Sequence, residues 1–336
     1  MLASSMQLQV HPPEIRASQV TGLSAPTIRL SGHSADLFAL SFSPDGQCIA
    51  SAGLDNEIWL WDVYSSGDQS QGGSLGVLKG HGAAILEIQW SGYDPSKLVS
   101  CSADKTLGLW DVVQGKRLRK ISGHEGIVNS CQISGNLIVS GSDDSTIRVW
   151  DIRLGKQAMI HSYEHDYQIL SVAMDNSNQN VYAGSLDNYV LKVPLKSFQD
   201  PQIIGECGDS VTGLSVSPDE NFIVSNSMDN SVTVWDNRPV CVSHNRIISK
   251  IDSAVMHSPE KLLLRARWSP QGQYFAAGSS DGVLSVFNSR GRDIAYRLPG
   301  HKASLNDLSF SPKDPRIIAS CSSDRTVILG ELSQQF

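Results

Sequence analysis

Three histidines in this chain are each followed, at similar spacings, by a serine, an aspartate and a tryptophan. The sets are His33-Ser51-Asp55-Trp61, His81-Ser100-Asp104-Trp110 and His124-Ser140-Asp144-Trp150. An imidazole held between a carboxylate and a hydroxyl group is the arrangement that activates a serine nucleophile in hydrolases. A chain needs such an active site only once, whereas this pattern recurs. We therefore interpret the sets as repeated structural networks.

The other reactive side chains match no catalytic, cofactor or metal motif. The sequence has no phosphate-binding loop and no H-E-x-x-H. His161 and His165 flank Tyr163-Glu164, and His257 lies apart, but no cysteine or third ligand stands at a spacing that suits zinc. We predict no catalytic residues, no cofactor and no metal, and hence a protein that is not an enzyme.

The elements that must position these sets are the strands of a repeat. Each copy has an aspartate in a tight turn, followed by a short apolar strand that ends in Trp-Asp in the best copies. The turn aspartates are Asp55, Asp104, Asp144, Asp187, Asp229, Asp281 and Asp324, at spacings of 49, 40, 43, 42, 52 and 43 residues. A period near 43 with a terminal Trp-Asp is typical of the WD repeat, which forms one four-stranded blade. We predict an all-β, seven-bladed WD-repeat β-propeller over residues 25–336.

Some copies are incomplete. We interpret the fourth and sixth as lacking the histidine; they have Ala183 and Ala277 in place of the serine, and lack the tryptophan. The fifth has Cys207 where the histidine would lie, and the seventh has Gly330 in place of the tryptophan. Because an orphaned buried polar group costs about 1–3 kcal/mol, we expect members of a set to be lost together. We expect the fifth and seventh blades to be less rigid.

Closure of the ring requires a strand from outside the repeats. Residues 27–30 precede the first Gly-His and belong to no blade of their own, so we predict that they form the outer strand of the last blade. Residues 1–24 are polar and carry Pro12-Pro13. We predict a flexible N-terminal tail there.

Charge and hydropathy argue against nucleic acid and membranes as direct partners. The net charge is −7, without the basic surplus that gripping nucleic acid requires, so RNA contact is expected to be indirect or minor. The one basic run is Lys116, Arg117, Arg119 and Lys120, which we interpret as solvated charges on an outer strand. No apolar stretch is long enough to span a membrane, and no secretory signal is evident. We expect no membrane association and no small-molecule substrate.

A propeller exposes side chains around the mouth of its central channel. The residue before each turn aspartate, and one early in each inner strand, are expected on this top face. The apolar members are Phe38, Leu54, Leu86, Leu170, Leu186, Met228 and Leu264. Exposed apolar patches mark protein interfaces, so we predict a partner-binding top face.

Several stretches resemble a particular family beyond the generic repeat. They are DSVTGLSVS (209–217), SNSMDNSVTVWDNRP (225–239), KLLLRARWSPQGQYFAAGS (261–279), YRLPGHKASLND (296–307) and SSDRTVILGEL (322–332). Over residues 25–332 the chain resembles the forty-kilodalton WD-repeat subunits of the spliceosomal U5 small nuclear ribonucleoprotein. The resemblance implies a nuclear, non-enzymatic scaffold, monomeric within a large complex, that supports pre-mRNA splicing. It would bind the large scaffold protein of that particle and other spliceosomal proteins.

An alternative rests on two W-D-x-R sequences. They are Trp150-Asp151-Ile152-Arg153 and Trp235-Asp236-Asn237-Arg238. In WD-repeat substrate receptors of cullin-RING ubiquitin ligases, which these sequences resemble, the arginine contacts the adaptor. This resemblance would assign Arg153 and Arg238 to adaptor binding; the competing interpretation is a structural arginine.

Overall fold

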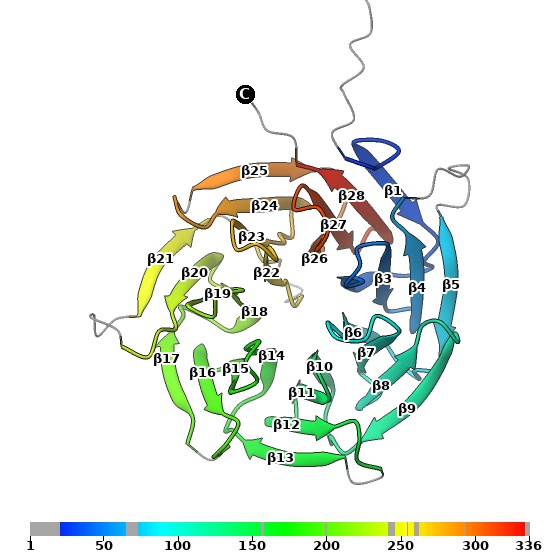
Figure 1. Cartoon of the computed structure of the whole chain (residues 1–336). Helices are drawn as coiled ribbons and strands as arrows, with labels where there is room; N and C mark the ends of the chain where they lie inside the picture. The colour runs from blue at the N-terminus through cyan, green and yellow to red at the C-terminus, as the bar shows by residue number, and fades with distance from the viewer. Residues whose placement is uncertain are drawn as a thin grey trace, which may run out of the picture.

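The computed structural model describes residues 21–64, 73–155, 158–198, 200–240, 246–253, 255–258, 262–291 and 293–332. These residues form seven four-stranded antiparallel sheets. Figure 1 shows the sheets arranged as blades around a central axis. They contain no helix, and therefore none long and apolar enough to cross a membrane. The predicted all-β, seven-bladed WD-repeat propeller is confirmed.

Each blade has an inner, a second, a third and an outer strand. The inner strands are β2 (Leu37–Phe42), β6 (Ile85–Trp90), β10 (Val128–Ser134), β14 (Ile169–Met174), β18 (Val211–Val216), β22 (Ala266–Trp268) and β26 (Leu305–Phe310). The second strands are β3 (Cys48–Gly53), β7 (Lys97–Ser102), β11 (Leu137–Ser142), β15 (Asn180–Ser185), β19 (Phe222–Ser227), β23 (Tyr274–Ala277) and β27 (Ile317–Ser322). The third strands are β4 (Glu57–Asp62), β8 (Thr106–Asp111), β12 (Thr146–Asp151), β16 (Tyr189–Pro194), β20 (Ser231–Asp236), β24 (Val283–Asn288) and β28 (Thr326–Glu331). The outer strands are β5 (Ser74–Lys79), β9 (Lys116–Ser122), β13 (Met159–Glu164), β17 (Gln202–Glu206), β21 (Ile247–Asp252), β25 (Ile294–Pro299) and β1 (Thr27–Ser31).

Burial along the strands follows their distance from the axis. The inner strand β14 is buried at every residue, because both of its faces pack against neighbouring blades. The outer strand β13 alternates between exposed and half-buried residues, as expected of a strand with one face in solvent. The core is therefore a set of apolar layers between adjacent blades.

The turn between the second and third strands has the same backbone shape in every blade. The residue after the turn aspartate has a positive φ, between 62° and 76°. These residues are Asn56, Lys105, Ser145, Asn188, Asn230, Gly282 and Arg325. The sixth blade has a glycine, Gly282, at this position. A Cβ atom there would lie 2.7 Å from the His301 carbonyl oxygen, so a larger residue would clash with the backbone. One face of the propeller carries these turns and also the links from each outer strand to the next blade. We call it the top face. The opposite end of the blades is the bottom face.

The ring is closed by the N-terminal strand. β1 pairs with β28 over five residues, from Thr27 opposite Gly330 to Ser31 opposite Thr326. Leu23 and Leu30 are each 3% exposed and pack in one core layer with Trp61 and Val327. The predicted tail of residues 1–24 is therefore too long, because Leu23 belongs to the core. Residues 1–20 lie outside the described residues.

Side chains of one inner strand satisfy the backbone of the next. An inner strand has a free edge toward the axis, with amide groups that need acceptors. The Glu87 carboxylate accepts from the Cys131 N–H at 3.1 Å, and the Ser130 hydroxyl oxygen accepts from the Val172 N–H at 2.9 Å. Equivalent acceptors are Ser41, Gln89, Gln132, Ser171, Ser215, Asp307 and Ser309. Polar residues at alternate positions of the inner strands therefore join consecutive blades.

Candidate functional site

The three predicted His-Ser-Asp-Trp sets are each brought together as one hydrogen-bonded chain. In the third blade, Nδ1 of His124 lies 2.8 Å from Oδ2 of Asp144, and Nε2 lies 2.7 Å from the Ser140 hydroxyl oxygen. The Trp150 indole N–H donates to that oxygen at 2.8 Å. The corresponding distances in the first two blades are His33–Asp55 2.6 Å, His33–Ser51 2.8 Å, Trp61–Ser51 2.8 Å, His81–Asp104 3.0 Å, His81–Ser100 2.7 Å and Trp110–Ser100 2.8 Å.

The geometry of these hydrogen-bonded sets leaves no room for a substrate. Ser140 is 0% exposed, and its oxygen already accepts from the indole. Because a carboxylate only accepts, the His124 ring donates a hydrogen bond through Nδ1 to Asp144. Its Nε2 then accepts a hydrogen bond from the Ser140 hydroxyl group. The hydroxyl group is thus saturated and shielded from water. The arrangement links the second strand, the third strand and the top-face turn of a blade.

The Ser140 hydroxyl group should contribute strongly to stability. Replacement by alanine leaves the Trp150 N–H and the His124 Nε2 buried without partners, each costing about 1–3 kcal/mol. We expect Ser140→Ala to lower the free energy of unfolding by about 2–4 kcal/mol, measured by urea denaturation. Ser162→Ala, on the exposed outer strand of the same blade, is the matched control and should change little. Equal effects of the two variants would contradict the network's role.

The fourth blade corrects one expectation from the sequence. It does keep a histidine: Nε2 of His165 lies 2.9 Å from Oδ2 of Asp187. His165 precedes Asp187 by 22 residues, the usual spacing, but follows Glu164 instead of glycine. With Ala183 in place of the serine, the chain of bonds stops at the histidine. The members of a set are therefore not always lost together.

Buried histidines make the fold sensitive to acid. Burial lowers the pKa of His81 and His301, and lowers that of His257 to about 4. Burial alone would raise the pKa of Asp104, but the Gly82 N–H, the Thr106 hydroxyl and His81 hold it below its usual range. Both kinds of group bind more protons when the chain is unfolded, so both destabilise the fold as the pH falls.

We therefore expect stability to fall between pH 6.5 and 4. The free energy of unfolding should drop by up to about 1.4 kcal/mol per pH unit for each histidine that stays neutral in the fold. Urea denaturation at several pH values measures this slope. His257→Gln should make the slope shallower at an unchanged fold. Constant or rising stability on acidification would be incompatible with the buried neutral histidines.

The predicted top-face residues do not all reach the surface. Leu54 is 52% and Leu186 42% exposed, and Phe38, Leu86 and Met228 are half-buried. Leu170 and Leu264, at 8% and 1%, are buried, and their assignment to a binding surface is wrong. Val255, in the long connection before β22, packs in the same core layer as Leu264. The Leu170 carbonyl oxygen accepts a hydrogen bond from the Arg265 guanidinium group, which extends across the channel.

Exposed apolar residues line one side of the top face. Tyr167, which the sequence analysis missed, is 50% exposed, and Met256 is 57% exposed. Backbone contacts place these residues next to one another. The Leu186 N–H donates to the carbonyl of Gln168, which precedes Ile169 and follows Tyr167 in the chain. The Ser210 hydroxyl group donates to the Leu186 carbonyl, and the Met228 N–H donates to the Ser210 carbonyl. The His257 N–H donates to Asn230 of the same turn as Met228. We call Tyr167, Leu186, Met228 and Met256 the top apolar arc; it crosses the fourth to sixth blades.

The two W-D-x-R arginines lie at the bottom face, after the third strands of their blades. Nη2 of Arg153 lies 2.6 Å from Oδ2 of Asp151, and Nη2 of Arg238 lies 2.6 Å from Oδ2 of Asp236. The Arg153 bond lowers the pKa of Asp151. The side chains remain 67% and 55% exposed. Each arginine thus closes its own turn and presents one side of its guanidinium group to solvent.

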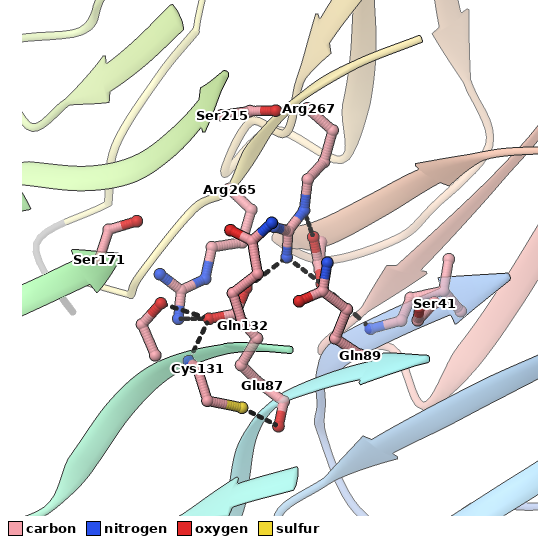
Figure 2. Close-up of polar contacts among 12 residues, drawn as sticks. Ser41, Glu87, Gln89, Cys131, Gln132, Ser171, Ser215, Arg265 and Arg267 are labelled. Atoms are coloured by element: carbon pink, nitrogen blue, oxygen red, sulfur yellow. Dashed lines mark hydrogen bonds and ion pairs between the residues drawn. The ribbon is translucent and has the colours of Figure 1, made fainter. Parts of the chain in front are cut away.

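A charged cluster at the axis was missed by sequence reasoning. The Arg267 Nη2 lies 2.5 Å from Oε1 of Glu87, and its Nε lies 3.3 Å from Oδ1 of Asp307. Nη2 of Arg265 lies 3.5 Å from Oε2 of Glu87, which also accepts from the Ser130 hydroxyl group. Figure 2 shows the two arginines reaching toward Glu87 across the centre of the ring.

The second arginine of the cluster also contacts the backbone of three other inner strands. The Arg265 guanidinium group donates to the carbonyl oxygens of Asn129, Leu170 and Thr212, at 2.6, 3.1 and 2.9 Å. Glu87 is 2% exposed. Burial would raise the pKa of Glu87, but Arg265 and Arg267 lower it overall. The signal in the sequence was the presence of charged residues within otherwise apolar inner strands. Their pairing across the ring was not visible there.

Within the described residues, no group of three histidines, cysteines or acidic residues is placed to hold a metal ion.

Comparison with known proteins agrees with this architecture. The model of the family "WD domain, G-beta repeat" matches residues 24–62, 72–111, 115–151, 198–236, 256–288 and 293–329. The unmatched interval contains most of the fourth blade. The chain is 39% identical to the U5 small nuclear ribonucleoprotein 40 kDa protein of Homo sapiens, over 97% of this chain and 87% of that protein. It is 35% identical to the protein of that name in Dictyostelium discoideum, over 92% and 85%.

A further relative carries a splicing name. The chain is 36% identical to the pre-mRNA-splicing factor cwf17 of Schizosaccharomyces pombe, over 94% of this chain and 90% of that protein. These similarities cover 92–97% of the chain, and so include the incomplete repeats. The chain therefore belongs to the WD-repeat family and, within it, to the group of the U5 small nuclear ribonucleoprotein 40 kDa proteins.

Proposed function

We propose that this protein is a non-enzymatic scaffold subunit of the U5 small nuclear ribonucleoprotein, acting in pre-mRNA splicing in the nucleus. The observation that carries the proposal is identity of 35–39% to U5 40 kDa proteins over 92–97% of the chain. Similarity of this extent covers the surface loops as well as the repeat frame. The saturated hydroxyl groups of the His-Ser-Asp-Trp sets support a scaffold rather than a hydrolase.

The partner contact we propose is between the top apolar arc and the large scaffold protein of the particle. The arc offers exposed aromatic, leucine and methionine side chains on a rigid support, the composition that protein interfaces favour. The net charge of −7 disfavours direct grip on RNA, so the RNA is held through proteins. The protein acts as a single copy within the complex.

Affinity purification from nuclear extract tests the function and the face together. The tagged protein should recover the U5 RNA and its large scaffold protein. Leu186→Asp combined with Met256→Asp should reduce this recovery about tenfold or more, because two buried contacts become desolvated charges. Ile203→Asp combined with Ile294→Asp, on exposed outer strands, is the matched control. Recovery unaffected by the arc variant would exclude this face, and absence of the U5 RNA would exclude the function.

The same purification addresses the ubiquitin-ligase alternative. The exposure of Arg153 and Arg238 at the bottom face is the observation in its favour. Each guanidinium group, however, already donates to the aspartate of its own turn. Recovery of a cullin adaptor that is lost with Arg153→Glu and Arg238→Glu, with no small nuclear RNA, would replace the splicing assignment.

A further inference from the structure

The outer strand of the second blade carries a concentration of positive charge that the scaffold function does not explain. Four of the five residues from Lys116 to Lys120 are basic, in a chain whose net charge is −7. In the part of the chain that the structure describes, no carboxylate lies within 4.0 Å of any of these four cations. The positive charge of this strand is therefore not neutralised by neighbouring side chains.

Two of these cations are held in place by neutral groups. The Arg117 guanidinium carbon lies 5.7 Å from the centre of the Trp110 ring, and its Nη1 donates to the Gly80 carbonyl at 2.5 Å. Arg119 donates to the carbonyl oxygens of Ile152 and Leu154 in the next blade. Such contacts fix the side chains without cancelling their charge. Lys116 and Lys120 point into solvent.

A groove runs beside this strand on the rim of the propeller. It lies between β9 and the strands β12 and β13 of the third blade, with a volume of about 980 Å³. Arg119, Lys120 and Arg148 line it together with the apolar Ile121 and Met159. Met159 is 46% exposed. β9 is the last strand of its sheet, so its outer backbone edge is unpaired in that sheet.

We propose that this rim groove binds an extended acidic segment of a partner protein that carries an apolar side chain. Opposite charge attracts the segment, the exposed Met159 receives the apolar side chain, and the open edge of β9 offers backbone hydrogen bonds. The groove suits a peptide better than RNA, because its one aromatic lining residue, Trp150, is 3% exposed and offers no ring face on which a base stacks.

Fluorescence anisotropy on the full-length protein tests the proposal. The probe is a labelled peptide of roughly ten residues made of glutamate and aspartate with two leucines, long enough to span β9 at about 3.3 Å per residue. Lys116→Glu combined with Lys120→Glu should weaken its binding about tenfold, since two exposed ion pairs become two repulsions. Binding should also weaken as salt rises.

Matched controls separate this site from the overall charge of the protein. Arg297→Glu combined with Lys302→Glu changes the net charge equally at exposed residues of other blades, and should leave binding unchanged. Met159→Gln should weaken the leucine-containing probe and leave a purely acidic peptide unaffected. The proposal is overturned if both charge variants weaken binding alike, if a glutamine-asparagine analogue binds as well, or if oligouridine RNA binds the groove more tightly than the peptide.

Discussion

A chain that lacks residues 1–31 should fail to fold, whereas a chain that lacks residues 1–20 should fold normally. The longer deletion removes β1, the outer strand of the seventh blade, and with it the pairing to β28. It also removes Leu23 and Leu30, each 3% exposed. Burial of a leucine side chain is worth about 1.5–3 kcal/mol, and each net backbone hydrogen bond about 1 kcal/mol. The summed loss is comparable with the whole stability of a typical domain, about 5–15 kcal/mol.

Loss of this strand also exposes what it covered. The third strand β28 would become an open edge, and Val327 and Leu329 of the shared core layer would meet water. We expect the long truncation to be insoluble or to lack a cooperative urea transition by tryptophan fluorescence. Leu30→Ala in the full chain should retain the transition at a lower midpoint. A peptide of residues 21–32 added during refolding should restore part of the folded population. A normal midpoint for the long truncation would show that the ring does not depend on β1.

Glu87→Gln should lower the free energy of unfolding by about 3–5 kcal/mol. The carboxylate faces both Arg265 and Arg267 at the axis, and its removal leaves two cations with a single acidic partner, Asp307. Breaking a buried charge network by removing one member costs this much, because the remaining charges stay desolvated. The glutamine keeps the shape, so the effect reports charge rather than volume.

A double-mutant cycle makes this expectation specific. Arg267→Met alone should also destabilise, and the double variant with Glu87→Gln should cost clearly less than the sum of the two. Asp94→Asn, which breaks the exposed pair between Asp94 and Lys97, is the matched surface control and should cost about 1 kcal/mol or less. A Glu87→Gln cost no larger than that of Asp94→Asn would mean that the axial cluster contributes little to stability.

The axial cluster and the two proposed surfaces divide the molecule into separate roles. The arginines and Glu87 meet at the centre of the ring, away from the two proposed partner surfaces. The top apolar arc and the basic rim groove differ in chemistry and lie on different blades, so variants of one should leave the other intact.

The repeat frame was determined by the sequence alone. The blade number, the order of strands and the His-Ser-Asp-Trp sets follow from short patterns that recur about every 43 residues. Within one copy, the histidine lies in the link before the inner strand, the serine on the second strand and the aspartate in the next turn. These positions are close in sequence, so their contacts can be predicted from spacing alone. His165 was the exception, since it lacks the glycine that marks the other histidines.

Only the tertiary structure decided which side chains meet across the ring. Glu87 and Arg267 are 180 residues apart and come from the second and sixth blades, so no local spacing relates them. The burial of Leu264 likewise depends on Val255, in a connection whose path no repeat predicts. In the first six blades, formation is a local property of the copy, because the hydrogen bonds join strands adjacent in sequence. The contents of the channel and the exposure of each face arise from the closed ring, which brings distant copies to one axis.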